Sequence, residues 1–343
     1  MSHTYFIRTS SLHGLDQQIE SVGGNLSEVL HRFGLAESSL TSEFERIDVQ
    51  VLVALLNHSA TTFDCPGFAL QLGSRQNLTM LGALGALIAN CATARDAKKV
   101  VSAFMAYHNQ TEYWDWQEYQ DIVVVQRFDN FYEVSDSRQY HELALSACFH
   151  LLRAFLGSYF KPIRVEMSHS PLSEKRSYNA HFGVETRFNQ ERDAIVMQGG
   201  FMDLPIRQEK VGTRQTHDLA KQTTRHYLES LRGQFQDDIV GQVATLLQQT
   251  MGSNESSIDN IAQLLHLNRR TLQRKLQAKG VIFRELFNET RHKKAKWYLT
   301  SSRMDITLMS SVLGYNDVSN FSRAFKKIEG ISPQKWRHKT VSP

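Results

Sequence analysis

The chain has 343 residues, of which 41% are hydrophobic and 22% are charged. These fractions match those of ordinary globular proteins, so they exclude a largely disordered chain and a protein built of apolar membrane segments. At about 100 to 200 residues per domain, the length predicts two or three domains. The three cysteines, Cys65, Cys91 and Cys148, are odd in number and contain no C-x-x-C pair. This spacing excludes a disulfide scaffold and a cysteine-rich zinc site, and it favours a reducing cytoplasm.

The net charge of +4 is distributed unevenly along the chain. Residues 235 to 343 contain 17 Lys and Arg against 9 Asp and Glu, a net +8, whereas residues 1 to 234 contain 22 against 26, a net −4. Such a split indicates a C-terminal module that binds a polyanion, attached to a body with another role. A solvated basic face would carry the same charge, so the charge alone leaves both interpretations open.

The N-terminus has no apolar stretch of signal-peptide length behind a basic start, which predicts that the protein is not secreted. The best candidate for a membrane span is the uncharged run of residues 77 to 94, which includes two asparagines, two threonines and two glycines. A buried helix or helix pair fits this run better, because a span needs about 20 mostly apolar residues. We therefore expect a cytoplasmic protein with no membrane partner.

Residues 1 to 210 are predicted to form an α+β domain. Helical periodicity dominates up to residue 107, with interruptions near Gly34, Gly73 and Thr93, and Thr93 precedes an acid by three residues as in a helix N-cap. Aromatic and β-branched residues then predict a β-hairpin, which is followed by a long apolar helix and a set of short elements. The expected ranges are helices at 15–22, 26–33, 49–56 and within 68–107, the hairpin at 113–125, the long helix at 137–159, strands at 163–167, 184–188 and 194–197, and a polar helix at 173–181.

Residues 211 to 234 are charged and helical in pattern, so a linker is expected there. Residues 235 to 343 are predicted to form an all-α domain, with a first helix at 237–251, two similar helix pairs at 257–280 and 305–330, and a long helix from about 283 to 301 between the pairs. A short turn separates the helices of each pair, which is a helix-turn-helix pattern. The second helix of each pair has an apolar stripe, formed by Leu272 and Leu276, and by Phe321, Phe325 and Ile328.

The faces opposite these stripes are left free to contact base edges or phosphates. The residues expected there are Arg269, Arg270, Gln273 and Arg274 in the first pair, and Val318, Ser319, Ser322 and Arg323 in the second. Four further basic residues, expected to contact mainly phosphates, are Lys326, Lys327, Lys335 and Arg337. Asn316 or Asp317 is expected to cap the second of these helices, and Ser332 with Pro333 predicts the start of a last short helix.

The segment LGYNDVSNFSRAFKKIEGISPQKWR closely resembles the C-terminal signature of the AraC/XylS family of bacterial transcription regulators. The positions that fall on its pattern are Gly314, Asp317, Ser319, Phe321, Arg323, Phe325, Lys326, Gly330, Ser332, Pro333 and Arg337. The first helix pair and the long helix resemble the family through Ala262, Leu272, Gln273, Arg274, Gly280, Arg291, Ala295 and Leu299. Residues 268 to 271 depart from the pattern, and Trp336 stands where tyrosine is common.

The upstream part resembles the arabinose-binding-type regulatory domain of a subset of these regulators, which is not the β-barrel of the best-known sugar-responsive members. The resemblance rests on segments at 64–73, 81–85, 93–97, 178–188 and 202–205. It implies a dimeric regulator that binds double-stranded DNA through two helix-turn-helix motifs and responds to a small-molecule effector. RNA polymerase is a further candidate partner. The name of the domain does not identify the effector.

The hairpin and the long helix are candidates for the walls of an effector pocket. The candidate effector-binding residues are Tyr107, Trp114, Trp116, His141 and Arg153, with Arg153 as the expected partner of an effector carboxylate. Core packing or a dimer contact is the alternative role for the two tryptophans.

Other chemistries find little support in the sequence. His141 and His150 are nine residues apart and do not share a helix face as metal ligands would, so we expect no metal and no cofactor. Gly82 and Gly85 lack the spacing of a nucleotide loop, and close helix packing is their expected role.

Two other functions remain as alternatives. The protein could be an effector-independent architectural DNA binder whose N-terminal domain only dimerises. It could also be an enzyme, because some relatives of the DNA-binding module are fused to alkyl-transfer repair domains. Those domains need a cluster of reactive cysteines, and three scattered cysteines argue against an enzyme.

Overall fold

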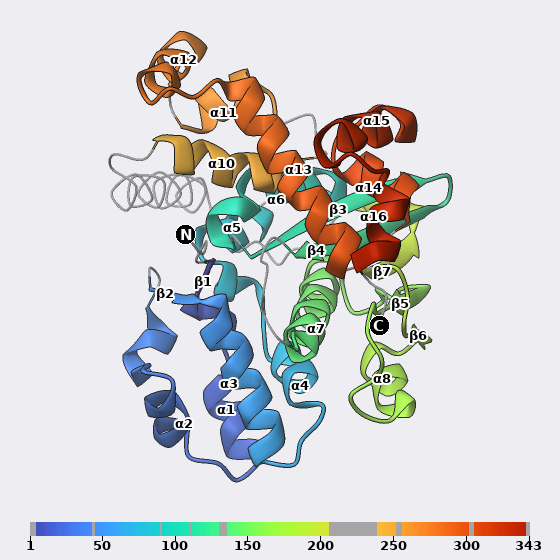
Figure 1. Cartoon of the computed structure of the whole chain (residues 1–343). Coiled ribbons are helices and arrows are strands. Elements are labelled where there is room, and N and C mark those ends of the chain that lie inside the picture. The colour runs from blue at the N-terminus through green and yellow to red at the C-terminus, as the bar shows by residue number, and fades with distance from the viewer. Residues whose placement is uncertain are drawn as a thin grey trace. The chain divides into compact units, whose positions relative to one another are not determined.

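The computed structural model describes residues 5–42, 45–89, 91–109, 111–129, 136–205, 239–251, 256–265, 267–301 and 305–340. The chain divides into two compact units, Met1–Leu228 and Glu229–Pro343, and each is described by itself (Figure 1). The linker predicted at 211 to 234 lies outside the described residues, so that domain boundary stays a prediction.

The N-terminal unit begins with a small antiparallel sheet and a group of helices. Strands β1 (Phe6–Arg8) and β2 (Arg46–Asp48) pair with Ile7 opposite Ile47. The helices are α1 (Leu15–Ser21), α2 (Leu26–Arg32), α3 (Val49–Thr62) and α4 (Phe68–Ser74). Gly34 has a φ of 68° after α2, which confirms the predicted end of that helix. The sequence predicted the helices here but not the two short strands.

The uncharged run from residue 77 forms a helical turn and a short helix. The 3₁₀ turn Leu78–Leu81 precedes α5 (Ala83–Ala89), and α6 (Ala94–His108) begins after Thr93, whose hydroxyl accepts a hydrogen bond from the Asp96 amide at 3.2 Å. A Cβ on Gly85 would lie 1.9 Å from the carbonyl oxygen of Leu78, so close packing explains this glycine, as predicted. None of the described helices combines the length and the apolar character that a membrane span requires.

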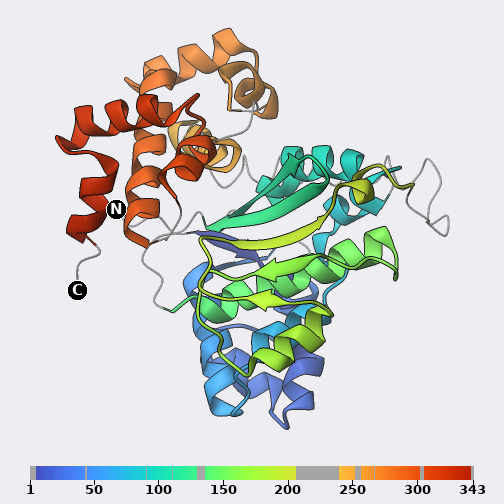
Figure 2. The same ribbon diagram turned by 90° about the vertical axis from the view of Figure 1, so that its right-hand side faces the viewer.

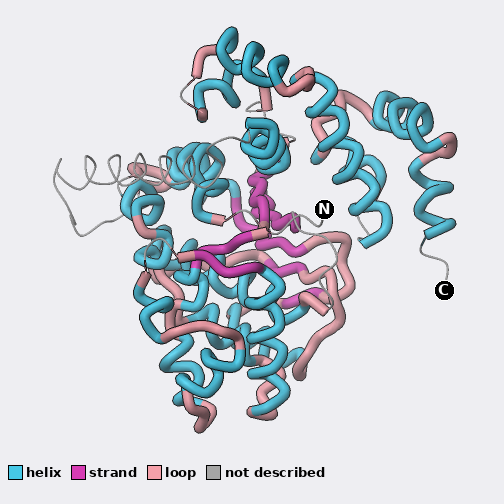
Figure 3. Tube along the Cα trace, turned by 60° about the vertical axis from the view of Figure 1, so that its left-hand side comes forward, coloured by secondary structure: helices cyan, strands magenta, loops and turns pink. Residues whose placement is uncertain are grey.

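A five-stranded sheet forms the centre of the unit. The strand order is β3 (Glu112–Tyr119), β4 (Ile122–Asp129), β7 (Asp193–Gln198), β5 (Arg164–Glu166) and β6 (Thr186–Arg187), and the pairs are antiparallel except for β5 with β6. Figure 2 shows these strands side by side, and Figure 3 shows the helices around them. The predicted hairpin and the three predicted strands are all present.

Helix α7 (Arg138–Leu156) joins the sheet to the N-terminal helices. It packs against β7, α3 and α4, and it contributes to two apolar cores: Tyr140 and Leu143 to the core of the first helices, and Leu145 and Phe149 to the core on the sheet. Helix α8 (Lys175–Phe182) packs beside β6. Because α7 belongs to both cores, these helices and the sheet form one packed body.

The C-terminal unit consists of helices in the part of the chain that the structure describes. They are α10 (Ile239–Thr250), α11 (Ile258–Leu264), α12 (Arg269–Ala278), α13 (Phe283–Ser301), α14 (Ile306–Val312), α15 (Val318–Glu329) and α16 (Pro333–Thr340). Helix α13 packs against α10 and α16, while α11 packs on α12 and α14 on α15. These bounds match the helices that the sequence predicted.

One residue of the apolar stripe predicted on α15 is not buried. Phe321 and Phe325 are buried, but the side chain of Ile328 is 59% exposed. Ile328 lies in the last turn before Gly330, which has a φ of 77° and ends the helix, so the stripe continues beyond the neighbouring helices and into solvent. The prediction that Ile328 belongs to the core was wrong.

Candidate functional site

Helix α12 presents a basic face opposite its buried stripe. It begins after Asn268, whose side-chain oxygen accepts a hydrogen bond from the Thr271 amide at 2.8 Å. Leu272 and Leu276 are buried, and this fixes the rotation of the helix about its axis. The four predicted contact residues of this helix are all exposed, as the sequence predicted: Arg269, Arg270, Gln273 and Arg274. Arg269 is also paired with Asp259 at 3.1 Å.

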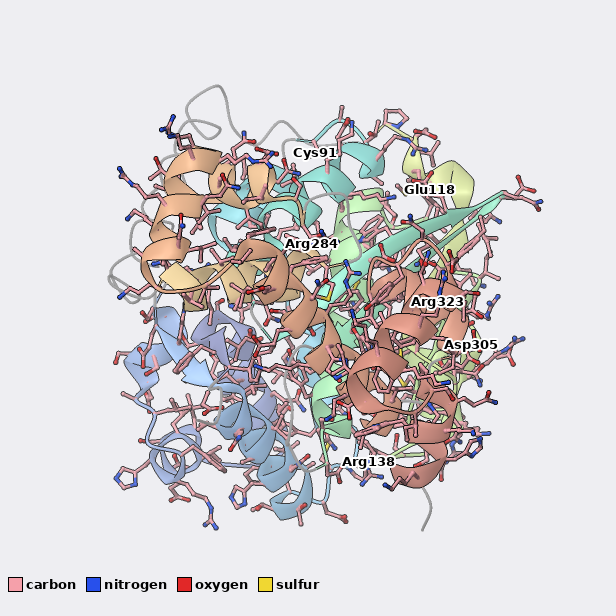
Figure 4. The ribbon with its side chains drawn as sticks, turned by 45° about the horizontal axis from the view of Figure 1, so that its top comes forward. Cys91, Glu118, Arg138, Arg284, Asp305 and Arg323 are labelled. Carbon is pink, nitrogen blue, oxygen red and sulfur yellow. The ribbon has the colours of Figure 1, made fainter. Side chains whose placement is uncertain are left out.

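Helix α15 has the same organisation. The Asp317 carboxylate caps it by accepting a hydrogen bond from the Asn320 amide at 2.7 Å, which identifies Asp317 rather than Asn316 as the cap. Arg323, labelled in Figure 4, is exposed and donates a hydrogen bond to the Asn320 side chain at 2.8 Å. Among the other predicted contact residues, the exposed ones are Ser319, Lys326 and Lys327, and the half-buried ones are Val318 and Ser322.

The end of α15 is fixed to α13 by ionic and aromatic contacts. Glu329 accepts a hydrogen bond from His292 at 2.7 Å and pairs with Lys296 at 3.0 Å. Burial acts to raise the pKa of Glu329, but hydrogen bonds from these two side chains hold it below its usual value. Lys296 also lies 4.6 Å from the centre of the Trp336 ring on α16. These contacts hold α15 and α16 in a defined orientation on α13.

The predicted phosphate-contact residues on α16 differ in exposure. Lys335 is exposed and its amide donates to the Ser332 hydroxyl at 3.3 Å, which confirms the predicted cap. Arg337 is half-buried. One lysine of this unit is removed from the surface altogether, because Lys294 on α13 is fully buried and burial lowers its pKa to about 7. In the described part of this unit, the exposed basic side chains therefore include those on α12, α15 and α16.

The N-terminal unit contains an apolar cavity with a volume of about 110 Å³. Trp114 and Trp116 of β3 form one wall, and Ile7 and Ser11 from the start of the chain contribute to another. Helix α7 provides a largely aliphatic wall formed by Leu143, Ala144, Ala147, Leu151, Leu152 and Phe155. The volume of this cavity is somewhat less than the roughly 150 Å³ of a cavity that binds benzene, so one ring or a short alkyl chain is the upper limit for a ligand inside it.

Polar groups gather at one end of the cavity around Glu112. Its Oε1 accepts a hydrogen bond from Trp114 Nε1 at 2.9 Å, and its Oε2 accepts one from the Tyr140 hydroxyl at 3.2 Å. The Thr111 hydroxyl lies 2.6 Å from the Tyr140 hydroxyl and 2.5 Å from Asn109 Oδ1, and it donates its one proton to one of these two oxygens. The cavity therefore has an apolar body and a hydrogen-bonded polar end.

A buried ionic cluster lies directly behind this polar end. Arg127 is fully buried, and its guanidinium donates to Glu112 at 2.7 Å, to Asp193 at 3.1 Å and to Asp129. Strand alternation explains this convergence, because Glu112, Arg127 and Asp193 all point to the same face of the sheet. Burial opposes the charge on Arg127, but the carboxylates of Asp129 and Glu112 hold its pKa well above the usual value.

His141 belongs to this ionic cluster and does not line the cavity. Its ring nitrogens lie 3.1 Å from an oxygen of Asp129 and 2.9 Å from an oxygen of Asp193. Burial acts to lower the pKa of His141, but these two carboxylates raise it to about 9. The imidazole is therefore a charged member of the cluster at neutral pH.

The structure brings together only some of the predicted effector residues. Trp114 and Trp116 line the cavity, whereas His141 and Arg153 do not. The lining residues of α7 recur every three or four positions from Tyr140 to Phe155; Arg153 lies off that face and is exposed. Arg153 is therefore not placed to bind a carboxylate in this cavity. The side chain of Tyr107 lies outside the described residues.

The described residues contain no group of histidines, cysteines and carboxylates arranged to hold a metal ion. His150 and His181 contact each other edge-on, with ring centres 5.3 Å apart. Burial, with His150 nearby, lowers the pKa of His181 to about 4, so its ring is neutral, and it hydrogen-bonds to Ser146 at 2.8 Å.

Sequence reasoning missed the ionic cluster and Glu112, because their residues are scattered over three strands and a helix.

Two family models match the chain. Residues 261–339 match a helix-turn-helix domain, and residues 23–206, which are 184 of the 343, match the arabinose-binding N-terminal domain of AraC transcription regulators. The chain belongs to the AraC/XylS family. This confirms the resemblance seen in the sequence. The protein is a DNA-binding transcription regulator of the AraC type and not an enzyme.

Individual relatives of the regulator are distant. The HTH-type transcriptional regulator VirS of Mycobacterium tuberculosis is 24% identical over 336 residues, which are 96% of each chain. The ornithine utilization regulator of Pseudomonas aeruginosa is 27% identical over 194 residues, or 56% of each chain. Among solved structures, the transcriptional regulator CdpR from Pseudomonas aeruginosa aligns with 91% of this chain and 97% of its own, at 18% identity and a TM-score of 0.43.

Proposed function

We propose that the regulator binds double-stranded DNA as a dimer in the cytoplasm, through two helix-turn-helix units, and that a small organic effector in the N-terminal cavity alters this binding. The units are α11 with α12 and α14 with α15. The observation that supports them most directly is the pair of helices α12 and α15, each with a buried apolar stripe and an exposed face rich in hydrogen-bond donors. RNA polymerase is a further partner in this proposal.

The exposed residues divide into two roles. Arg270, Gln273 and Arg274 on α12, with Arg323 on α15, have the planar or bidentate donors that distinguish bases in the major groove. Val318, Ser319 and Ser322 on α15 reach bases or the flanking phosphates. The residues that contact mainly the DNA backbone, together with the capped helix N-termini, are Arg269, Lys326, Lys327, Lys335 and Arg337. Arg269 is assigned to the backbone because its pairing with Asp259 competes with contact to a base.

The cavity supports the effector part of the proposal. It is enclosed by several elements of a unit that makes up more than half of the chain, and it combines apolar walls with a polar end. An effector changes DNA binding only by its differential affinity for two states of the protein, and a tenfold change in DNA affinity requires about 1.4 kcal/mol of coupling. The alternative is an effector-independent DNA binder whose N-terminal unit only dimerises.

DNA affinity measured with and without metabolite extract separates these two functions. The full chain is compared with residues 235 to 343 on the DNA sites that the full chain occupies in cells. Effector control predicts that an extract component changes the affinity of the full chain and leaves that of the C-terminal segment unchanged. If the full chain binds as two tethered copies of the segment would, and no extract component alters this, the N-terminal unit only dimerises.

A further inference from the structure

The end of the cavity near Glu112 has a charge imbalance that bears on what the cavity holds. Three carboxylates meet there, those of Glu112, Asp129 and Asp193, and the cations facing them are Arg127 and His141. With both cations charged, two positive groups face three carboxylates and one negative charge is left over; with a neutral imidazole, two are left over. The cluster is therefore negative in either state of the histidine, although it is buried.

Among the residues that the structure describes, Glu112 is the one carboxylate of this cluster that lines the cavity. Asp129 and Asp193 lie behind Arg127 and are not among the lining residues, whereas Glu112 is. The Glu112 carboxylate accepts three hydrogen bonds among the described residues, two on Oε2 and one on Oε1. A carboxylate has about four acceptor positions, so Oε1 keeps one for a donor in the cavity.

The described lining of the cavity contains no lysine, arginine or histidine. Arg127 is not among the lining residues, and its guanidinium is committed to three carboxylates. Burial, with Glu112 nearby, also raises the pKa of the Cys148 thiol, which stays uncharged on the wall. The described lining therefore offers no cation to pair with an effector carboxylate, and burying such a charge without one is costly.

We propose that the cavity binds a small primary amine with an apolar body, whose ammonium group donates a hydrogen bond to Glu112 Oε1. This inference rests on the proposed effector control and specifies its ligand class. The ammonium group offsets the excess negative charge of the cluster, and the rings of Trp114 and Trp116 provide faces that attract a cation. The apolar body of the amine, about the size of one ring, packs against the α7 side chains that line the cavity.

Three probes that share a phenyl ring and differ in their polar group test this ligand class. Benzylamine, benzyl alcohol and benzoate are titrated calorimetrically into the full chain at pH 7. Because hydrogen bonds to charged groups are the stronger ones, benzylamine is expected to bind at least about tenfold more tightly than benzyl alcohol, and benzoate to show no binding. In Glu112→Gln the amine is expected to lose this advantage while the alcohol still binds, which shows that the cavity remains folded.

A second pair of variants locates the binding. Ala147→Phe fills the cavity and is expected to abolish binding of both the amine and the alcohol. Ala154→Phe adds the same side chain at an exposed position of the same helix and is expected to change neither affinity.

The possible results separate the ligand class from effector control. Equal binding of amine and alcohol, stronger binding of benzoate, or no binding of benzylamine overturns the amine proposal. Effector control is contradicted separately, if no extract component changes the DNA affinity of the full chain.

Discussion

Gly73 on α4 and Ser146 on α7 are in direct contact. A Cβ on Gly73 would lie 2.5 Å from the Cβ of Ser146 and 2.8 Å from the carbonyl oxygen of Leu143. The Ser146 hydroxyl donates a hydrogen bond to the carbonyl oxygen of Leu70, at 2.7 Å, so the two helices are connected by a hydrogen bond at the point where they are closest. The absence of a side chain at Gly73 is what permits this approach.

Gly73→Ala is expected to destabilise the N-terminal unit. The added methyl group meets backbone and a short buried side chain, which cannot move away freely, so the expected cost is about 1 to 3 kcal/mol. Chemical denaturation of the full chain, followed by circular dichroism, measures it. Gly200→Ala is the control, because a Cβ there meets nothing within 4 Å and the expected change is near zero. Equal stability of the two variants would show that α4 and α7 are not in close contact.

The contribution of His141 to the free energy of unfolding is expected to fall as the pH rises above neutral. Its pKa is about 9 in the folded protein and about 6.5 when unfolded. The folded state therefore holds the proton more tightly, so this contribution is complete below pH 6.5 and is lost as the pH rises through about 9. In a Lys294→Met background, which removes the opposite contribution of that buried lysine between about pH 7 and 10.5, unfolding midpoints measured from pH 6 to 10 should fall over this interval.

A matched variant isolates the contribution of His141 from that of Glu142. Burial raises the pKa of Glu142 to about 8, so it also favours folding at low pH, but over the lower window from about pH 4.5 to 8. His141→Gln is expected to remove the fall in stability between pH 8 and 9, whereas Glu142→Gln is expected to leave it. An unchanged fall in His141→Gln would contradict the assignment.

Substitutions on α12 and α15 are expected to affect DNA binding in different ways. Arg274→Ala should cost about 1 to 3 kcal/mol on cognate DNA and relax the preference at one base position. Lys327→Ala should weaken binding to all sequences similarly and reduce the slope of log affinity against log salt by about one. Arg176→Ala, at an exposed position of α8 in the other unit, is the control. Equal losses on cognate and random DNA for Arg274→Ala would show that it reads no base.

The length of α13 predicts the footprint of one monomer. Its 19 residues span about 28 Å at about 1.5 Å per residue, which suits two recognition helices about one DNA turn, or about 34 Å, apart. Hydroxyl-radical footprinting of the full chain should show protection over about two turns per monomer. Protection of a single turn per monomer would mean that only one helix pair is engaged.

Arg153→Ala is expected to leave the response to an effector unchanged, because Arg153 is exposed and does not line the cavity. Ala144→Leu, which narrows the cavity, should reduce the response. DNA affinity with and without an active extract measures both. A response lost in Arg153→Ala and kept in Ala144→Leu would place the effector outside the cavity.

Local patterns predicted the helices of the C-terminal unit closely. Helix α13 has the predicted bounds, and the buried Leu272 and Leu276 orient α12 as their spacing indicated. The stripe failed only at Ile328, because periodicity describes a face of a helix and not how far the neighbouring helices extend along it. Strands β1 and β2 were missed because three-residue strands pair across about 40 positions and leave no local period.

The polar end of the cavity could not be predicted from local patterns. Glu112, Arg127 and Asp193 meet only because three strands pair in one register. His141 was expected in the pocket, but it follows Tyr140 by one residue, and a rotation of about 100° along the helix directs it to the ionic cluster instead. A single sequence indicates which face of a strand a residue occupies, and the pairing of the strands decides its neighbours.

Part of the cavity wall comes from residues that precede the match to the arabinose-binding domain model. Ile7 and Ser11 line the cavity, yet the match to the arabinose-binding domain model begins at residue 23. The backbone of Ile7 also pairs with Asn109 in an isolated bridge, which holds this segment against the rest of the wall. The start of the chain thus belongs to the site, so Ile7→Ala or Ser11→Ala is expected to change ligand preference while leaving the DNA sites unchanged.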